Sequence, residues 1–333
     1  MTDTKGDNGA DVVAMTYAQA VERAIAEEMR RDDDVFFLAT ATPPGGLLDE
    51  FGARRIRRTP ISENGFTGAA VGAAVRGLRP IVWWRTAAFS LVAFDQVVNH
   101  AAKLHYMTGG QVRVPMVMRA TSGAGNQSAA QHAASMHSIY AHAPGLKVVM
   151  PSCASDALGL MKAAIRDDNP VVVLEPLRCQ SQVENVPVSE TAPIPLGTGR
   201  FARQGTTITV VALGYMVQVA VAAAEILARD GIEVEIIDPR TVTPLDIEMI
   251  RRSVQKTGRL IATDDAPPMC SFTSEVLAVV GEHADTFACL RAPMRRVCGA
   301  DAPTAFNIAL EALATPSVDD LVTAITQVVG AER

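Results

Sequence analysis

The feature that most constrains this chain is a repeated alternation of short apolar runs with stretches of helical spacing. Continuous apolar character, without the polar alternation of a half-exposed strand, is typical of strands covered on both faces. Strands that alternate with helices predict an α/β fold with doubly wound, mainly parallel sheets. In the first half the strands are expected at 35–38, 80–84, 114–119, 146–151 and 170–174.

The same alternation resumes after residues 181–204, which have no periodicity and are interpreted as a linker. The 333 residues therefore divide into a first domain at 15–180 and a second at 205–333. The polar, Gly- and Asp-rich residues 1–14 are expected to form a disordered leader. Thr16 and Gln19 predict a capping box that opens the first helix. In the second domain, strands are expected at 207–213, 234–238, 260–264 and 294–298.

Composition and missing motifs exclude several classes of protein. A net charge of −6 argues against binding to nucleic acid. The five cysteines are scattered without a CxxC pair, and no signal peptide or long apolar run is present. These features predict a reduced, cytoplasmic protein without a membrane span. No GxGxxG follows an expected strand, and the P-loop, GxSxG, HExxH and EF-hand patterns are absent as well.

One carboxylate stands out in residues 59–68, a loop that turns directly into a helix of small residues. Glu63 lies at the mouth of this helix, and Gly68 and Gly72 share one of its faces. Each glycine costs about 1 kcal/mol of helix propensity, which close approach of another backbone would offset. A buried acid needs a partner. Glu63 is therefore either an acid favoured by the helix dipole or a functional acid, and the segment alone leaves both open.

Further candidates lie at the expected strand ends of the first domain, where ligands bind in open α/β sheets. They are Phe89, the polar loop 122–127 and His132, which competes with His137 and His142 on the same segment. A loop histidine is commonly a structural hydrogen-bonding group, but three near one strand end favour a proton carrier.

A cluster of arginines follows residues 39–46, the Pro- and Gly-rich loop after the first expected strand. It is either a solvated face or a dock for an acidic surface or a substrate anion. Its members are Arg54, Arg55, Arg57 and Arg58.

The order of motifs resembles the β subunit of the thiamine-diphosphate-dependent first component of 2-oxoacid dehydrogenase complexes, of the pyruvate, branched-chain and acetoin type. The resemblance covers residue 15 to the end. It implies a transketolase-like pyrimidine-binding domain followed by a transketolase C-terminal domain. The motifs that carry it are TPISENGFTGAAVGAAVRGLRPIV, FSLVAFDQVVNHAAK, AHAPGLKVVMP, GLMKAAIRDDNPVVVLEP, IEVEIIDPRTVTPLD and KTGRLIATDDAP.

The resemblance implies a role for each candidate residue. Glu63 matches the family glutamate that hydrogen-bonds a ring nitrogen of the cofactor's aminopyrimidine, and Phe89 matches the aromatic residue that stacks on the pyrimidine. His132 matches the histidine implicated in passing the acyl group to a lipoyl arm. Asp167 and Asn169 match positions that in some members help hold a structural potassium ion. A turn between helix and strand explains this last pair equally well.

The resemblance also implies a partner. The chain lacks the Gly-Asp-Gly and Asn-Asn motif that holds magnesium diphosphate, so an α subunit is expected to hold magnesium and part of the thiamine diphosphate in an α2β2 assembly. The implied substrate is a small 2-oxo acid, and the implied acceptor is a lipoyl or carrier-domain acyltransferase. Two alternatives stay open: a specialised carboligase or ketol-transfer enzyme of the same architecture, and a non-catalytic scaffold, which the retained site residues disfavour.

Three departures from the family pattern remove negative charge. Residues 39–46 replace an acidic loop, Trp83 replaces an acid on the second strand, and Arg58 replaces an acid before the Glu63 loop. They predict that substrate or proton communication between paired sites differs from that in the housekeeping complexes. Arg85, which follows two tryptophans, is expected either to face an anionic substrate or to pair with an acid of the partner.

Overall fold

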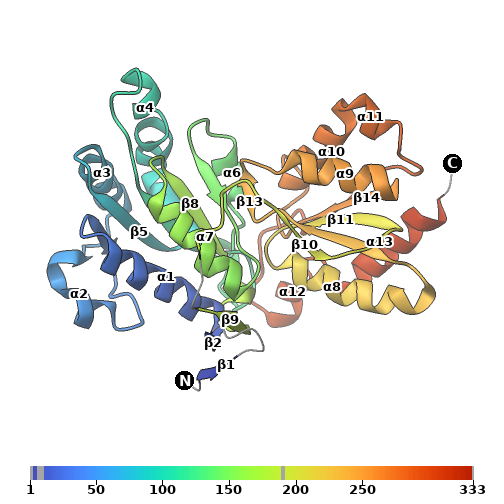
Figure 1. The fold of residues 1–333 in the computed structure, drawn as a ribbon, viewed down its shortest axis with the longest axis horizontal. Helices are drawn as coiled ribbons and strands as arrows, with labels where there is room; N and C mark the ends of the chain where they lie inside the picture. The colour runs from blue at the N-terminus through green and yellow to red at the C-terminus, as the bar shows by residue number, and fades with distance from the viewer. Residues whose placement is uncertain (1–2, 6–10, 189–191, 332–333) are drawn as a thin grey trace. The chain divides into compact units, whose positions relative to one another are not determined.

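The computed structural model describes residues 3–5, 11–188 and 192–331, which form two compact units (Figure 1). The first unit comprises Met1–Ser122 and Ile139–Leu196, and the second comprises Gly123–Ser138 and Gly197–Arg333. Each unit is built on a mainly parallel sheet with helices packed against it, which confirms the expected α/β class. Within the described part of the chain, every helix is too short or too polar to cross a lipid bilayer.

The sheet of the first unit has the strand order β7-β8-β6-β5-β3-β4, and every one of these pairings is parallel. A second, antiparallel sheet has the order β1-β2-β9. The strands are β1 (Asp3–Lys5), β2 (Asp11–Thr16), β3 (Val35–Ala39), β4 (Ile56–Arg58), β5 (Arg79–Thr86), β6 (Val117–Ser122), β7 (Lys147–Val149), β8 (Val171–Pro176) and β9 (Val183–Pro187).

The helices of the first unit connect these strands, and α1 packs along α7 (Figure 1). Thr16 and Gln19 form the expected capping box at the start of α1. The helices are α1 (Tyr17–Arg31), α2 (Leu47–Arg55), α3 (Glu63–Val75), α4 (Leu104–Met107) and α7 (Ala154–Arg166), with the shorter η1 (Ala87–Ala93), η2 (Gln96–Ala101) and η3 (Leu177–Cys179). The chain passes between the units within α6 (His137–Ala141).

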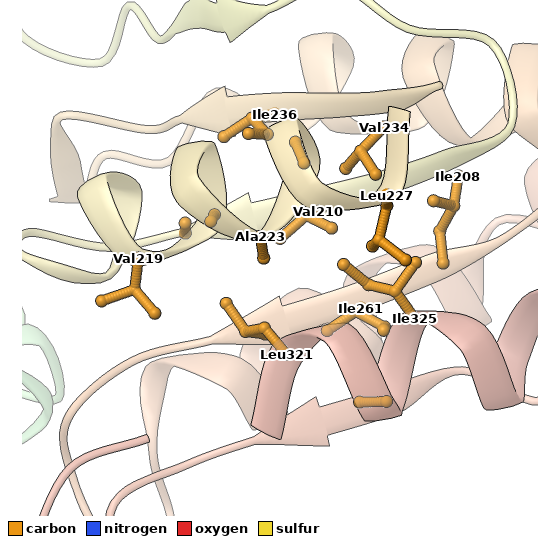
Figure 2. Close-up of a cluster of buried hydrophobic side chains, with 14 of the residues drawn as sticks. Ile208, Val210, Val219, Ala223, Leu227, Val234, Ile236, Ile261, Leu321 and Ile325 are labelled. Atoms are coloured by element: carbon orange, nitrogen blue, oxygen red, sulfur yellow. The ribbon is translucent and has the colours of Figure 1, made fainter. Parts of the chain in front are cut away.

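The second unit contains a sheet with the order β10-β12-β11-β14-β15, in which only the β10–β12 pairing is antiparallel. Helices α8 and α13 pack together over this sheet and enclose an aliphatic core (Figure 2). The strands are β10 (Arg200–Arg203), β11 (Ile208–Ala212), β12 (Val234–Asp238), β13 (Thr241–Thr243), β14 (Leu260–Thr263) and β15 (Arg295–Val297). The helices are α5 (Ala129–His132), α8 (Met216–Leu227), η4 (Ala228–Asp230), α9 (Ile247–Thr257), α10 (Phe272–Glu282), α11 (Ala284–Phe287), α12 (Ile308–Ala312) and α13 (Val318–Gly330).

Two segments expected to lack structure contain strands. Residues 11–14 of the expected leader belong to β2, which pairs antiparallel with β9 inside the expected linker. Residues 1–2 and 6–10 of that leader lie outside the described residues. The linker also contains β10, which pairs with β12. These strands depend on partners far away in the sequence, so their local polar composition did not reveal them.

The segment that follows β5 does not form a single α-helix. Residues 87–93 form a 3-10 helix, and residues 96–101 form a π-helical turn. Thr86 caps the first of these by accepting a hydrogen bond from the amide of Ala88 at 3.4 Å. Val97 and Ala101 of this segment are buried in the core, whereas Val92 is 65% exposed.

Candidate functional site

The carboxyl ends of the parallel strands in the first unit meet at one edge of the sheet, where ligands bind in open α/β folds. Along this edge Arg58 on β4 lies opposite Ala39 on β3, and Ala39 lies opposite Trp83 on β5. Trp83 in turn lies opposite Arg119 on β6. The departures identified in the sequence therefore share one level of the sheet, beside the loop that leads to Glu63.

Glu63 is the first residue of α3 and is 8% exposed. Its carboxylate makes no hydrogen bond or ion pair with any residue that the structure describes. Ser62 precedes it without capping the helix through its side chain. A nearly buried acid without a partner in its own chain fits a group whose partner comes from outside the chain.

Phe89 lies in η1, which packs against α3, so the structure brings the elements of Glu63 and Phe89 together. The indole nitrogen of Trp84 donates to the hydroxyl of Thr67 on α3 at 3.0 Å. This buried bond ties β5, which leads into η1, to the helix that begins with Glu63. The aromatic ring of Phe89 is half-buried, which leaves part of it accessible.

Buried contacts of Ser90 hold the turn that carries Phe89. The hydroxyl of Ser90 contacts both the carbonyl of Ala87 and the hydroxyl of Tyr140, and all three residues are buried. Burial raises the pKa of Tyr140 to about 12, so this phenol stays protonated at ordinary pH. Tyr140 also stacks on Trp84, with ring centroids 6.3 Å apart. The anchored turn gives Phe89 a fixed backbone position.

His132, expected in the first domain, lies in the second unit, because the segment Gly123–Ser138 packs there. It ends α5 and its side chain is exposed. The carboxylate of Glu311 on α12 accepts hydrogen bonds from the amides of Gly125 at 2.9 Å and Gln127 at 3.0 Å. The segment that carries His132 is therefore held at its start by one buried acid.

The three histidines of this segment have different surroundings. His137 is fully buried against Asp264, with Nε2 and Oδ2 3.2 Å apart, whereas His142 is exposed. Burial alone would lower the pKa of His137, but the hydrogen bond and charge of Asp264, with the charge of Asp265, raise it above its usual value. His137 therefore has a structural ion-pair role. This distinguishes it from His132, which the sequence could not separate from it.

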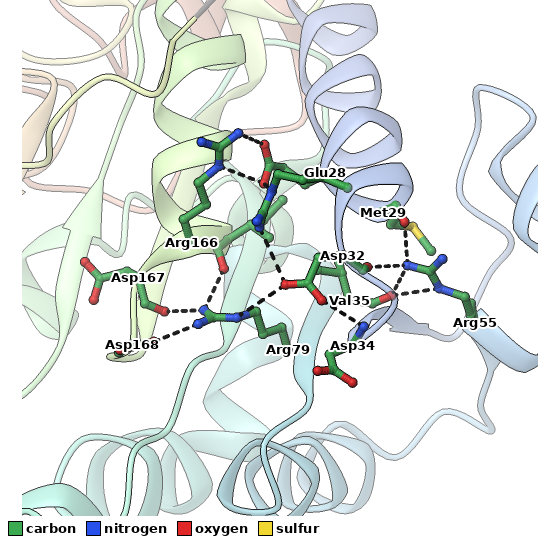
Figure 3. Close-up of polar contacts among 12 residues, drawn as sticks. Glu28, Met29, Asp32, Asp34, Val35, Arg55, Arg79, Arg166, Asp167 and Asp168 are labelled. Carbon is green, nitrogen blue, oxygen red and sulfur yellow. Dashed lines mark hydrogen bonds and ion pairs between the residues drawn. The ribbon is translucent and has the colours of Figure 1, made fainter.

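Asp167 and Asn169 form a turn between α7 and β8. The carboxylate of Asp167 accepts from the amide of Asn169 at 2.9 Å and from its side chain at 3.0 Å, and it also pairs with Lys147. Burial would raise the pKa of Asp167, but Lys147 and Asn169 hold it below its usual range. Arg79 donates to the main-chain carbonyl of Asp167 at 3.0 Å (Figure 3). These contacts fit the turn interpretation, and a potassium ion at this pair stays a prediction.

The arginine cluster divides by role. Arg55 donates to the carbonyls of Met29, Asp32 and Val35, each at 2.8 Å, and so fastens the turn between α1 and β3 (Figure 3). Arg58 is exposed and makes no ion pair with a described residue. Only part of the cluster is therefore structural.

Sequence reasoning missed a buried ion pair beside the site. The guanidinium of Arg119 on β6 donates to both carboxylate oxygens of Glu175 on β8, at 2.7 and 3.0 Å. Its Cζ atom lies 5.3 Å from the ring centroid of Trp83. The available signal was a charge inside each of two otherwise apolar strands, since such residues are almost never buried unless paired. Among the described residues, no group of three or more His, Cys, Asp or Glu side chains is arranged to hold a metal.

Comparison with known proteins agrees with this arrangement. The transketolase pyrimidine-binding domain matches residues 13–182, and the transketolase C-terminal domain matches residues 197–321. A solved structure described as a split gene transketolase, inactive beta4 tetramer, has a TM-score of 0.79 and covers 96% of this chain and 99% of its own. At 22% identity it shows the fold alone.

Curated relatives are closer in sequence. The pyruvate dehydrogenase E1 component subunit beta of Rhizobium meliloti (strain 1021) is 44% identical over 328 residues, which cover 96% of this chain and 71% of that protein. The Rickettsia felis protein of the same name is 43% identical over 322 residues, with 94% and 98% covered. The mitochondrial subunit of Saccharomyces cerevisiae is 43% identical over 331 residues, with 96% and 90% covered. The chain belongs to the family of β subunits of the thiamine-diphosphate-dependent first component of 2-oxoacid dehydrogenase complexes.

Proposed function

We propose that this chain works with an α subunit in an α2β2 assembly that decarboxylates a 2-oxo acid and transfers the acyl group to a lipoyl or carrier domain. The α subunit would hold magnesium and the diphosphate part of the cofactor. Support comes from one observation above all, the nearly buried and unpaired carboxylate of Glu63 at the start of α3. A group of this kind fits a polar partner supplied by a cofactor.

The residues of this chain would bind and orient one end of thiamine diphosphate. When bound, the cofactor would supply the stabilised carbanion that decarboxylation of a 2-oxo acid needs. Glu63 would hold a proton in a hydrogen bond to a ring nitrogen of the aminopyrimidine, in a position where burial strengthens such a bond. Phe89 would offer its ring to the pyrimidine, and the anchored turn around Ser90 would keep that ring in place.

His132 would act at the later stage, in acyl transfer to the carrier. Its side chain is exposed at the end of α5, which suits a group that meets an incoming domain. The start of its segment is held by Glu311, which limits movement of the loop that precedes it. An imidazole has the pKa range that proton transfer at neutral pH requires.

The test compares the complex of this chain and its α partner with Glu63→Gln. The amide keeps the size of the side chain but removes the acid, so we expect turnover of 2-oxo acids to fall by about 10²- to 10⁴-fold. Asp49→Asn, an exposed acid in the first turn of α2, is the matched control and should leave turnover unchanged. Calorimetry with thiamine diphosphate, run on each complex, separates loss of binding from loss of chemistry.

Two results would contradict the proposal. One is wild-type turnover by the Glu63→Gln complex. The other is full activity of the purified chain without its α partner.

Acyl transfer is tested separately, by adding a lipoyl domain to the complex and comparing His132→Gln with wild type. A His132→Gln complex that transfers acyl groups as fast as wild type would remove the proposed role of this residue.

A further inference from the structure

Strand β5 departs from regular geometry next to the candidate site. Trp83 pairs with Arg119 on β6 and Thr86 pairs with Thr121, so β5 advances three residues where β6 advances two. Inside this bulge the backbone of Arg85 has a φ of 68°, which no other described non-glycine residue of the first unit adopts in the left-handed region. Bulges are frequent beside active sites, where the extra residue re-aims a side chain.

The unusual backbone of Arg85 is held in place. The hydroxyl of Thr121 donates to the main-chain carbonyl of Arg85 at 2.7 Å. The guanidinium carbon of Arg85 lies 6.0 Å from the ring centroid of Trp83, within reach of a cation–π contact. A left-handed backbone is unfavourable for a residue with a Cβ. Strain of this kind persists where surrounding contacts fix it, and it gathers at ligand-binding positions.

The charge of Arg85 has no acidic partner among the described residues, and its side chain is exposed. Other arginines of the first unit do find carboxylates, such as Arg79 with Asp168 and Arg166 with Glu28. Arg85 thus differs from the structural arginines of its own unit.

Arg58 is a second exposed arginine at this edge without an acidic partner among the described residues. It ends β4, and β3 separates it from β5. Two strand spacings put Arg58 about 10 Å from Trp83, the residue of β5 at the same level, and Arg85 lies two residues further along β5. Between them Ala39 begins the loop of residues 39–46, which contains no acid. The edge therefore concentrates positive charge on both sides of an uncharged loop.

We propose that Arg85 is a specificity-determining residue that binds a second, distal carboxylate of the substrate, so that the preferred 2-oxo acid is a dicarboxylic one. This inference rests on the proposed function. A guanidinium binds a carboxylate through two parallel hydrogen bonds, which gives orientation as well as charge recognition. Arg85 lies near the end of β5, which leads directly into η1 and Phe89, the aromatic residue proposed to contact the cofactor. Arg58 adds to the positive field without a direct contact being required.

The test uses the complex with the α partner and two substrates of similar length, 2-oxoglutarate and 2-oxohexanoate, whose distal end carries no charge. Loss of one charge-assisted carboxylate contact corresponds to about 10- to 100-fold in binding. Arg85→Gln should therefore raise KM for 2-oxoglutarate by about that factor. KM for 2-oxohexanoate, and kcat for both acids, should stay within about twofold. Arg229→Gln, an exposed arginine of η4 in the second unit, is the matched control and should change neither KM.

Several outcomes would overturn the proposal. Equal changes in KM for both acids, or no change for either, would show that Arg85 does not recognise the distal group. Weaker assembly with the α partner at unchanged KM would assign the guanidinium to a partner acid. Weaker binding of thiamine diphosphate in calorimetry would assign it to the cofactor.

The same measurements separate this proposal from the proposed function. Wild-type turnover of 2-oxohexanoate together with absent selectivity for the dicarboxylate would contradict only the role of Arg85. Absence of turnover with every 2-oxo acid, together with absence of thiamine diphosphate binding, would contradict both.

Discussion

The Nε2 atom of His137 lies 3.2 Å from the Oδ2 atom of Asp264, and both side chains are fully buried in the second unit. Burial by itself disfavours the imidazolium, but Asp264 and Asp265 more than offset this and raise the pKa of His137. A raised pKa in the folded state stabilises the fold below the unfolded value of about 6.5. That contribution is lost as the pH rises through the raised pKa.

The first prediction concerns this pair. The free energy of unfolding should fall as the pH rises above about 6.5, by at most about 1.4 kcal/mol per pH unit from this group. His137→Gln cannot gain the proton and should show a flatter profile over the same range. Urea unfolding between pH 6 and 9 measures both, with the exposed His142→Gln as control. If the free energy of unfolding depended on pH in the same way in wild type and His137→Gln, the ion pair would not be the cause of that pH dependence.

The second prediction concerns Arg119 and Glu175, which are 5% and 0% exposed. Arg119→Met leaves the carboxylate of Glu175 buried without its cation, which should cost about 3–5 kcal/mol of stability. Adding Glu175→Met removes that charge, so the double variant should recover most of the loss. A double-variant cycle by chemical denaturation gives the coupling energy. If the double variant lost as much as the two single variants combined, the two residues would not act as a pair.

The third prediction uses the two glycines of α3. A Cβ at Gly68 would come within 3.0 Å of Oε1 of Gln96, whereas a Cβ at Gly72 would meet nothing within 4 Å. Gly72→Ala should therefore stabilise the isolated chain by about 1 kcal/mol through helix propensity. If this open face contacts the proposed α partner, Gly72→Leu should weaken assembly while leaving the isolated chain folded. Thermal unfolding and co-purification measure the two effects. Assembly by Gly72→Leu at wild-type strength would place the contact elsewhere.

The fourth prediction concerns Glu311, which is 4% exposed and accepts hydrogen bonds from the amides of Gly125 and Gln127. Glu311→Ala leaves these two donors without their acceptor, so their amide hydrogens should exchange with solvent at least about tenfold faster. Hydrogen exchange read by mass spectrometry or NMR provides the measurement. Glu282→Ala, at the exposed end of α10, is a control that should not change them. Unchanged exchange at Gly125 would mean that other contacts hold this loop.

Much of the fold could be predicted because most of its parallel strands are short apolar runs that can be recognised from local sequence. The run 234–238 was expected as a strand and forms β12 with the same bounds, and the first helix begins with the expected capping box. The antiparallel strands β2, β9 and β10 were not predicted. Their residues become strands through hydrogen bonds to distant partners, and propensity carries little information about such pairings.

The site was predictable where one segment carries the signal. Glu63 was expected at a helix mouth in a buried position, and both features are present. The roles of Arg119 and Glu175 needed the sheet order, because their strands are neighbours only in the folded chain. The histidines of one segment likewise look alike in sequence, and only burial against Asp264 separates His137 from the others.

The second unit is assembled from two separate stretches of the chain, since Gly123–Ser138 packs with Gly197–Arg333. A fragment that stopped at Leu196 would carry this segment without Glu311 or Asp264, the acids that hold it. Recombination that exchanged whole C-terminal halves between relatives would likewise separate His137 from its matched acid unless both changed together. The boundary that looks simplest along the sequence is therefore a poor place to divide the chain, because side-chain contacts within the second unit join residues on either side of it.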